Sequence, residues 1–129
     1  MDPLITKMIS KAKATMANSY APYSKFNVGC CIETATGTFF CGTNVENNSY
    51  SLAICAESAA ITAMIAAGEQ VIKNVVVLAG TNQLCSPCGA CRQRISEFSN
   101  DQTMIHMCSE DKLFHSMTMK ELLPLAFDF

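Results

Sequence analysis

Charged side chains are scarce in this sequence. Only 16% of its 129 residues are Asp, Glu, Lys or Arg, and the formal net charge is -2. The only two arginines, Arg92 and Arg94, stand almost adjacent, so the chain has no basic stripe that would neutralise a nucleic-acid backbone. We therefore expect no polynucleotide partner. Half of the residues are hydrophobic, which is too many for a disordered chain, and the weakly charged surface predicts large contacts between subunits.

Long hydrophobic runs are also absent. The most apolar stretch, residues 75–80, is far shorter than the ~20 residues that span a bilayer. The first residues, 1–4, carry an acidic side chain where a secretory signal has positive charge, and no long apolar segment follows them. The sequence predicts a cytoplasmic protein that does not enter a membrane.

No linker, internal repeat or low-complexity segment interrupts the chain. A chain of this length buries roughly two-thirds of its unfolded surface, so we expect residues 1–129 to form one domain without help from disulfides. Segments with helical periodicity alternate with short β-rich runs, which predicts a layered α/β fold. The expected helices are 3–18, 52–67, 88–98 and a short one after Thr118, and the expected strands are 28–34, 38–43, 72–80 and 103–108.

Turn signals lie between these segments. Thr36 and Gly37 predict a hairpin between the first two strands, and Gly68 is placed to end the second helix as a left-handed cap. Residues 82–87 are expected to turn the chain into the third helix.

The eight cysteines fall into two groups. Without a secretion signal, free thiols or metal ligands are expected rather than disulfides. Four cysteines lie in or beside apolar, strand-like segments and are expected to pack as small hydrophobic residues: Cys30, Cys31, Cys41 and Cys108. The other four stand near predicted helix starts: Cys55, Cys85, Cys88 and Cys91.

The second group favours a catalytic zinc site. Cys55 at one helix start, with Cys88 and Cys91 at another, offers three thiolates and leaves the fourth tetrahedral position on zinc open to water. Zinc lowers the pKa of such a water to roughly 7. Glu57, two residues after Cys55, is placed to move the proton of that water without binding the metal.

The spacing leaves three other interpretations open. An iron–sulfur cluster would use Cys85, Cys88 and Cys91, but the fourth position of that motif falls on Ile95. A redox pair of Cys88 and Cys91 at a helix start leaves Cys55 unexplained. A closed structural zinc site would recruit Cys85, from the far side of the turn at 86–87.

Five short stretches then follow one another along the chain: YSKFNVG at 23–29, GTNVENNSY at 42–50, CAE at 55–57, SPCGACRQ at 86–93 and ELLP at 121–124. In this order and spacing they resemble the small homotetrameric cytidine deaminases of pyrimidine salvage, over nearly the whole chain. The resemblance implies a three-layer α/β/α sandwich with a five-stranded mixed sheet. It also implies hydrolytic deamination of cytidine and 2'-deoxycytidine to uridine and 2'-deoxyuridine.

The resemblance further assigns the site. It implies one Zn²⁺ per chain on Cys55, Cys88 and Cys91, with Glu57 carrying protons to the ring N3 and to the departing ammonia. Its implied substrate-binding residues are Phe26, Asn44, Glu46, Ala56, Tyr50 and Phe127.

In that assignment Asn44 and Glu46 hold the ribose 3'-hydroxyl, and Phe26 packs against the pyrimidine. Tyr50 and Phe127 complete the pocket of a neighbouring subunit, so free nucleosides rather than polymers are the expected substrates. Taken without the resemblance, residues 44–47 are an ordinary polar turn and Phe26 is a core aromatic.

Two histidines, His106 in a strand and His115 in a polar loop, lack ligand spacing to the cysteines and are expected to be structural. Two alternatives to the activity remain: deamination of another aminopyrimidine nucleoside, such as a nucleoside antibiotic, or thiol–disulfide exchange.

The chain departs from the family pattern at Ser58. Many members have Arg directly after the catalytic Glu, where it offsets the charge of the zinc thiolates. With serine at this position, two helix dipoles and one hydroxyl hydrogen bond from Ser58 are the expected replacements.

Overall fold

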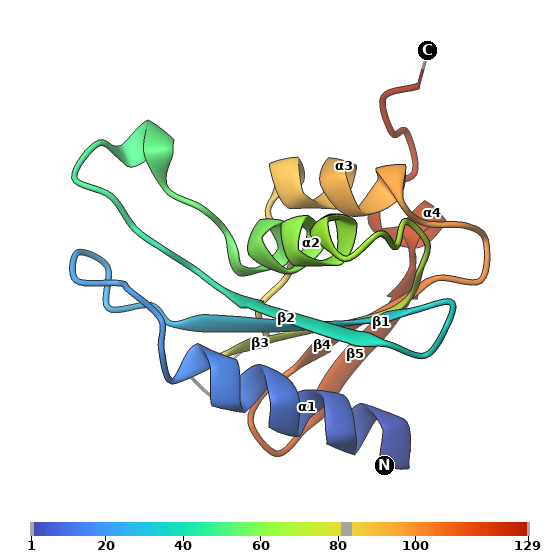
Figure 1. Cartoon of the computed structure of the whole chain (residues 1–129), viewed down its shortest axis with the longest axis horizontal. Helices are drawn as coiled ribbons and strands as arrows, with labels where there is room; N and C mark the ends of the chain where they lie inside the picture. Colours follow the sequence, from blue (N-terminus) through green and yellow to red (C-terminus); the bar gives the residue numbers. More distant parts are fainter. Residues whose placement is uncertain (1, 81–83, 129) are drawn as a thin grey trace.

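The computed structural model describes residues 2–80 and 84–128, and Figure 1 shows how their elements are arranged. The helices are α1 (Pro3–Met16), α2 (Ala56–Ala66), α3 (Gly89–Glu97) and α4 (Met119–Leu122), with a short 3-10 turn at Tyr50–Leu52. The strands are β1 (Val28–Thr34), β2 (Phe39–Thr43), β3 (Ile72–Ala79), β4 (Met104–Cys108) and β5 (Leu113–Thr118). Among the described residues, no helix has the length and apolarity needed to cross a bilayer.

The strands form one mixed sheet in the order β2-β1-β3-β4-β5. β3 and β4 are parallel and are joined through α3, whereas the other neighbouring pairs are antiparallel. α1 covers one face of this sheet, and α2 and α3 lie side by side on the other (Figure 1). The expected three-layer α/β/α sandwich with a five-stranded mixed sheet is confirmed.

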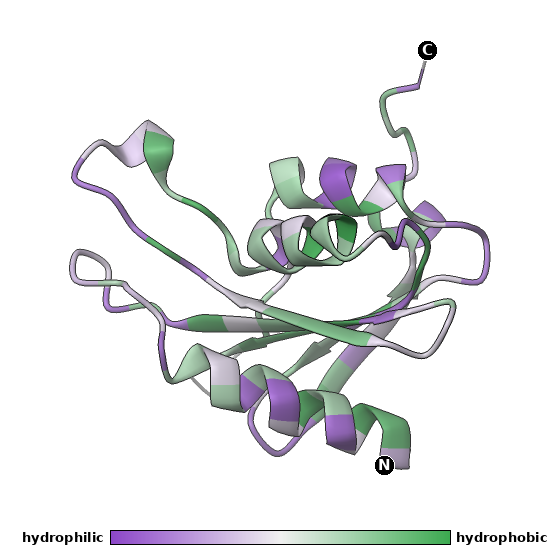
Figure 2. Cartoon of the chain, in the orientation of Figure 1, coloured by the Kyte–Doolittle hydropathy of each residue, from purple (hydrophilic) through white to green (hydrophobic). Residues whose placement is uncertain are grey.

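The sheet separates two apolar cores. Val75 and Val77 of β3 face the core under α2 and α3, while Val76 and Leu78 face the core under α1. All four side chains are fully buried, as the unbroken apolar run predicts for a central strand. In Figure 2 the α1 ribbon changes between hydrophilic and hydrophobic along its length, because its buried side chains recur at helical spacing.

Gly42 on β2 sets the position of α2. A Cβ at this residue would lie 2.4 Å from the Ala56 carbonyl oxygen and 2.5 Å from the Ala60 nitrogen. Only a hydrogen atom therefore lets the first turns of α2 rest directly on β2. Gly29 on β1 has the same part on the opposite face, where a Cβ would lie 2.4 Å from the Ala12 carbonyl oxygen of α1.

The start of the second helix differs from the expectation. The sequence predicts a helix from residue 52, but α2 begins at Ala56. Backbone hydrogen bonds in both directions between Val45 and Ile54 hold the chain extended just before Cys55, which overrides the helix propensity of this segment. At the other end Gly68 has φ +89°, so the left-handed cap is confirmed.

The fifth strand was not located from the sequence. The placement of His115 in a polar loop was wrong, because it lies in β5 at the edge of the sheet. An edge strand exposes much of both faces, and β5 buries none of its six residues fully, so its hydrophobic pattern is weak. The turn expected at 82–87 lies partly outside the described residues.

Candidate active site

Two helix N-termini meet on the α2–α3 side of the sheet. Cys55 is the N-cap of α2 and Cys88 is the N-cap of α3, both with extended backbone, and Cys91 follows in the first turn of α3. The sequence predicted Cys55 inside the helix, but it is the N-cap residue, directly before the first-turn N–H groups that have no intrahelical acceptor. The positive ends of both helix dipoles therefore favour negative charge here.

The three sulfurs form a compact cluster. The Sγ atoms of Cys55, Cys88 and Cys91 lie within 4.8 Å of one another, and those of Cys55 and Cys88 are 3.8 Å apart. Within residues 2–80 and 84–128, this is the only group of three or more His, Cys, Asp or Glu side chains placed to hold a metal ion. Cys85 is outside the group, so the structure favours a three-cysteine site over one closed by a fourth thiol.

Three thiolates this close together would repel one another, because each carries a negative charge. Burial, together with the neighbouring Cys91 and Cys88, raises the pKa of Cys55 to about 12. Burial and the charge of Glu57 also raise the pKa of Cys91. Burial disfavours ionisation of Cys88 as well, but hydrogen bonds from the Cys91 backbone and from the other two thiols outweigh it and lower the Cys88 pKa. A divalent cation would let all three ionise together, so the donor set fits zinc.

Glu57 supplies the carboxylate beside this cluster. It is the second residue of α2 and is only 4% exposed, yet it lines the same cavity as Cys55 and Cys88. Burial raises its pKa, against a smaller opposing effect of its own backbone N–H. A carboxyl group whose pKa is raised toward neutrality is suited to accept and return protons.

The cavity in front of Glu57 has a volume of about 270 Å³. It contains four of the substrate-binding residues expected from the resemblance: Phe26, Asn44, Glu46 and Ala56. Its other lining residues, which the sequence did not single out for this role, include Ile54 and Ser86. The cavity is mostly apolar with a few polar groups, as small-molecule sites are.

Asn44 and Glu46 are held in place by the loop before β1. The Asn44 side chain accepts hydrogen bonds from the Val28 backbone at 3.0 Å and the Ser19 hydroxyl at 2.6 Å, and donates one to the Phe26 carbonyl at 2.8 Å. This arrangement fixes Phe26 at the cavity and leaves one Asn44 amide hydrogen for a ligand.

Glu46 accepts hydrogen bonds from the hydroxyl and backbone of Ser24 and from the Tyr23 backbone. These bonds, the Ser24 hydroxyl first, lower the pKa of Glu46 and keep it a carboxylate.

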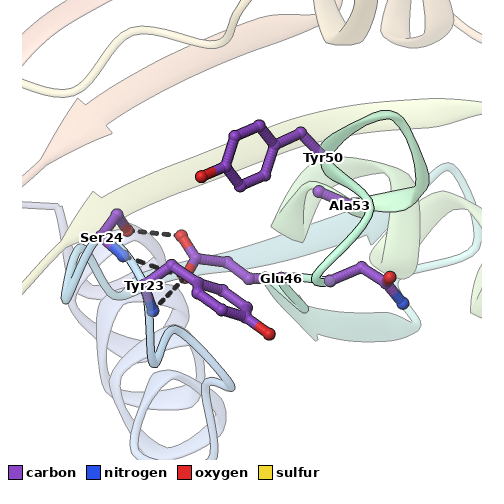
Figure 3. A pocket seen from close by; sticks show the side chains of 6 residues that line it. Tyr23, Ser24, Glu46, Tyr50 and Ala53 are labelled. Carbon is purple, nitrogen blue, oxygen red and sulfur yellow. Dashed lines mark hydrogen bonds between the residues drawn. The ribbon is translucent and has the colours of Figure 1, made fainter.

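Tyr50 and Phe127 do not line this cavity. Tyr50 is 82% exposed and lies over a neighbouring cavity of about 330 Å³, where Figure 3 shows it across from Glu46 and Ser24. Glu46 and Ala53 line both cavities, so the two adjoin. Phe127 is 71% exposed and lies by Gln93, whose side chain exchanges two hydrogen bonds with its backbone.

Arg92 is a structural residue of the site that sequence reasoning did not assign. Its guanidinium donates to the Pro87 carbonyl at 2.9 Å, the Ser86 hydroxyl at 2.8 Å and the Leu122 carbonyl at 3.2 Å. These bonds tie the segment before Cys88 to the end of α4. The three acceptors are far apart in the sequence or on irregular backbone, so no local pattern could have revealed them.

Comparisons with known proteins agree with this geometry. The family model described as "Cytidine and deoxycytidylate deaminase zinc-binding region" matches residues 4–107. The chain belongs to this family. It therefore shares the zinc-binding region of these enzymes, and the three-cysteine cluster is where this chain would hold the ion.

Individual relatives cover most of the chain. A cytidine deaminase of Sporosarcina psychrophila is 37% identical over 95% of this chain and 90% of its own length. One from Mycoplasma pneumoniae is 39% identical over 91% of this chain and 89% of its own. The solved structure of a cytidine deaminase from Burkholderia pseudomallei matches with a TM-score of 0.88 and 35% identity, covering 98% of this chain and 100% of that one.

Proposed function

We propose that this deaminase-family chain hydrolyses cytidine and 2'-deoxycytidine to uridine and 2'-deoxyuridine. In this reaction water replaces the exocyclic amino group at C4, and ammonia leaves. The observation that carries the proposal is that Cys55 and Cys88, two of the three clustered cysteines, line the same cavity as the buried Glu57. Zinc bound by these thiolates would supply a water whose pKa is lowered to roughly 7.

Glu57 is the proton carrier in this proposal. Its carboxylate takes a proton from the attacking water, delivers one to N3 of the ring, and later helps to protonate the leaving amine. Each of these transfers occurs at one wall of the cavity, where Glu57 lies beside Cys55 and Cys88. The raised pKa of Glu57, caused by its burial, supports a group that holds a proton part of the time.

The remaining cavity residues orient the nucleoside. Phe26 covers one face of the pyrimidine, while Asn44 and the ionised Glu46 bind the ribose 3'-hydroxyl. Ala56, the first residue of α2, has a backbone N–H without an intrahelical acceptor, and it is placed to donate to the ring carbonyl. This polar set selects a nucleoside over a free base, because a free base lacks the ribose hydroxyl that Asn44 and Glu46 would bind.

We further propose that the chain is one domain that works as a homotetramer in cytoplasmic pyrimidine salvage. Apolar side chains in the segment 50–54, before α2, support assembly. Tyr50, Leu52 and Ile54 are all exposed in the single chain. In the assembly Tyr50 and Phe127 complete a neighbouring subunit's pocket.

Ammonia release from a panel of cytosine, cytidine, 2'-deoxycytidine and their phosphates tests the proposal, together with zinc analysis of the purified protein. We expect one zinc per chain and turnover of both nucleosides. Turnover of only another aminopyrimidine nucleoside would contradict the substrate assignment. A metal-free protein whose Cys88 and Cys91 cycle as a disulfide would contradict the whole proposal.

A further inference from the structure

Cys91 is the buried thiol of the cluster. Its residue is fully buried, whereas Cys88 is exposed and Cys55 is partly exposed, so water cannot solvate the Cys91 sulfur as a thiolate. Besides the other two cysteines, Ser58 reaches it, with its hydroxyl oxygen 3.5 Å from Cys91 Sγ. Ser58 is the third residue of α2, so this contact joins the two helices that carry the cysteines.

The Ser58 hydroxyl has a second partner. The Arg94 guanidinium donates a hydrogen bond from Nη1 to Ser58 Oγ at 3.0 Å. Because a guanidinium has only donors, Ser58 accepts this bond and its own hydrogen remains available for the Cys91 sulfur. The hydrogen bonds therefore run in one direction, from Arg94 to Ser58 to the thiolate.

The two arginines of the chain have different parts. Arg92 uses each of its three guanidinium nitrogens to hold the segment around Pro87 and the end of α4. Arg94 is exposed, and the hydrogen bond to Ser58 is the one that the structure gives its side chain. Cys91 and Arg94 are three residues apart on α3 and so share one helix face, which lets a surface cation approach the buried thiolate through a short side chain of α2.

We propose that Arg94 is a positioning residue that, through Ser58, brings positive charge to the Cys91 thiolate and so helps this site to retain zinc. The inference rests on the proposed function, because it assumes that the three thiolates bind the ion. Three thiolates outweigh the charge of Zn²⁺, and the guanidinium offsets the excess. The hydroxyl transmits that charge by orienting and polarising its own hydrogen toward the sulfur.

Zinc release to an excess of chelator, followed with a coloured zinc indicator, tests this proposal on the purified protein. The variants are Arg94→Gln, Ser58→Ala, the double variant and the conservative Arg94→Lys. Lys73→Gln is the matched control, because it removes the same charge from an exposed residue of β3. Circular dichroism of each variant verifies that it is folded.

We expect Arg94→Gln and Ser58→Ala each to release zinc about 10- to 100-fold faster, the range for losing a residue that supports a metal ligand. The double variant should be no faster than the faster single variant, since both changes remove one hydrogen-bond chain. Arg94→Lys should stay closer to the parent than Arg94→Gln, and Lys73→Gln should equal the parent.

A second readout reports on the sulfur itself. In protein loaded with Co²⁺, the thiolate-to-metal absorption should shift in Arg94→Gln and Ser58→Ala in the same direction, and remain unchanged in Lys73→Gln. Equal release rates and spectra for Arg94→Gln and the parent would overturn the inference, as would strictly additive effects in the double variant. A parent protein that binds no zinc, or binds it without deaminating cytidine, would instead contradict the proposed function.

Discussion

At the scale of single residues, Glu57 is buried and also lines the cavity, and its proposed role as a proton carrier requires both properties. A carboxyl group exposed to water is almost entirely ionised at neutral pH. It would therefore seldom hold the proton that a leaving amine needs. The burial that raises the pKa of Glu57 comes from the packing of α2 on the sheet, while the first turn of that helix keeps the side chain at the cavity wall.

Replacing Glu57 by Gln tests its role directly. Glu57→Gln keeps the size of the side chain but cannot carry a proton, so we expect zinc to remain bound and turnover to fall by at least about 10²-fold. Zinc analysis and ammonia release from cytidine measure the two effects separately. A rate within a few-fold of the parent would show that another group moves the proton.

The residues of the site differ in how far the sequence could predict them. Cys55, Cys88 and Cys91 were predicted to gather because each stands at a helix start, and helix starts are visible in a local pattern. The expected Ser58 contact with a thiolate is also present, at 3.5 Å from Cys91. The approach of Arg94 to Ser58 could not be predicted, because it depends on how two helices pack side by side.

At the scale of elements, a single glycine couples the sheet to the site. Cys55 is the N-cap of α2 and Glu57 lies in its first turn, and that turn rests on Gly42 of β2. A helix that contacts a sheet at backbone distance cannot adjust by rotating a side chain. The position of α2 on the sheet therefore depends on the absence of a Cβ atom at Gly42.

Gly42→Ala and Gly29→Ala separate this coupling from ordinary destabilisation. Each added Cβ would lie 2.4 Å from a helix carbonyl oxygen, α2 in the first case and α1 in the second. We expect both to lower the free energy of unfolding by about 1–3 kcal/mol, as overpacking does. Only Gly42→Ala should also speed zinc release and reduce kcat at a temperature where both are folded. Equal effects of the two variants on zinc release would contradict the coupling.

A network of hydrogen bonds between polar side chains also crosses four strands of the sheet. Asn74 of β3 donates to Glu33 of β1 at 2.9 Å, and its oxygen lies 2.8 Å from His106 Nε2 on β4. His106 Nδ1 lies 2.8 Å from the Ser116 hydroxyl on β5. Because Asn74 presents its oxygen, the neutral His106 ring carries its hydrogen on Nε2 and donates it to Asn74, which leaves Nδ1 to accept the Ser116 hydroxyl hydrogen.

The burial of His106 in this network predicts that the stability of the protein depends on pH. Burial lowers the pKa of His106, against a smaller opposing effect of Asp2. Below the unfolded value of about 6.5 the unfolded chain binds a proton that the folded chain does not, so stability falls as the pH decreases through this range. The urea midpoint should drop less between pH 7.5 and 5.5 in His106→Gln than in the parent. His115→Gln, at an exposed position of β5, should behave like the parent, and a parent-like slope in His106→Gln would refute the assignment.

Element boundaries were predicted best where local signals decide them. The hairpin of β1 and β2, the left-handed Gly68 and the start of α4 after Thr118 all depend on residues a few positions apart. The start of α2 was missed because the Val45–Ile54 bridge, a contact between segments, holds the preceding residues extended. β5 was missed because it buries none of its six residues fully and its sequence shows no clear alternating pattern, unlike the other edge strand, β2.

At the scale of the whole molecule, the single chain leaves part of the expected site unused. The cavity beside the cysteines is lined by residues 26, 28, 44–46, 53–57, 85, 86 and 88, while Tyr50 and Phe127 are both largely exposed. Exposed aromatic side chains on a chain with few charges are suited to contacts between subunits. Shared sites would make activity depend on assembly.

Mixing two inactive variants tests that dependence. Phe127→Ala should lose activity if Phe127 completes a neighbour's pocket, and it keeps the hydrogen bonds to Gln93, which use only the backbone of residue 127; circular dichroism verifies that the variant is folded. Glu57→Gln is inactive for a chemical reason, so each variant retains what the other lacks. Unfolding and refolding them together should restore activity at roughly one site in four, since half of the sites have Glu57 and half of those meet an intact Phe127.

Light scattering verifies that the mixture is oligomeric, and refolding each variant alone is the control. A mixture no more active than its components, or a monomer that is fully active at assay concentration, would contradict a shared site.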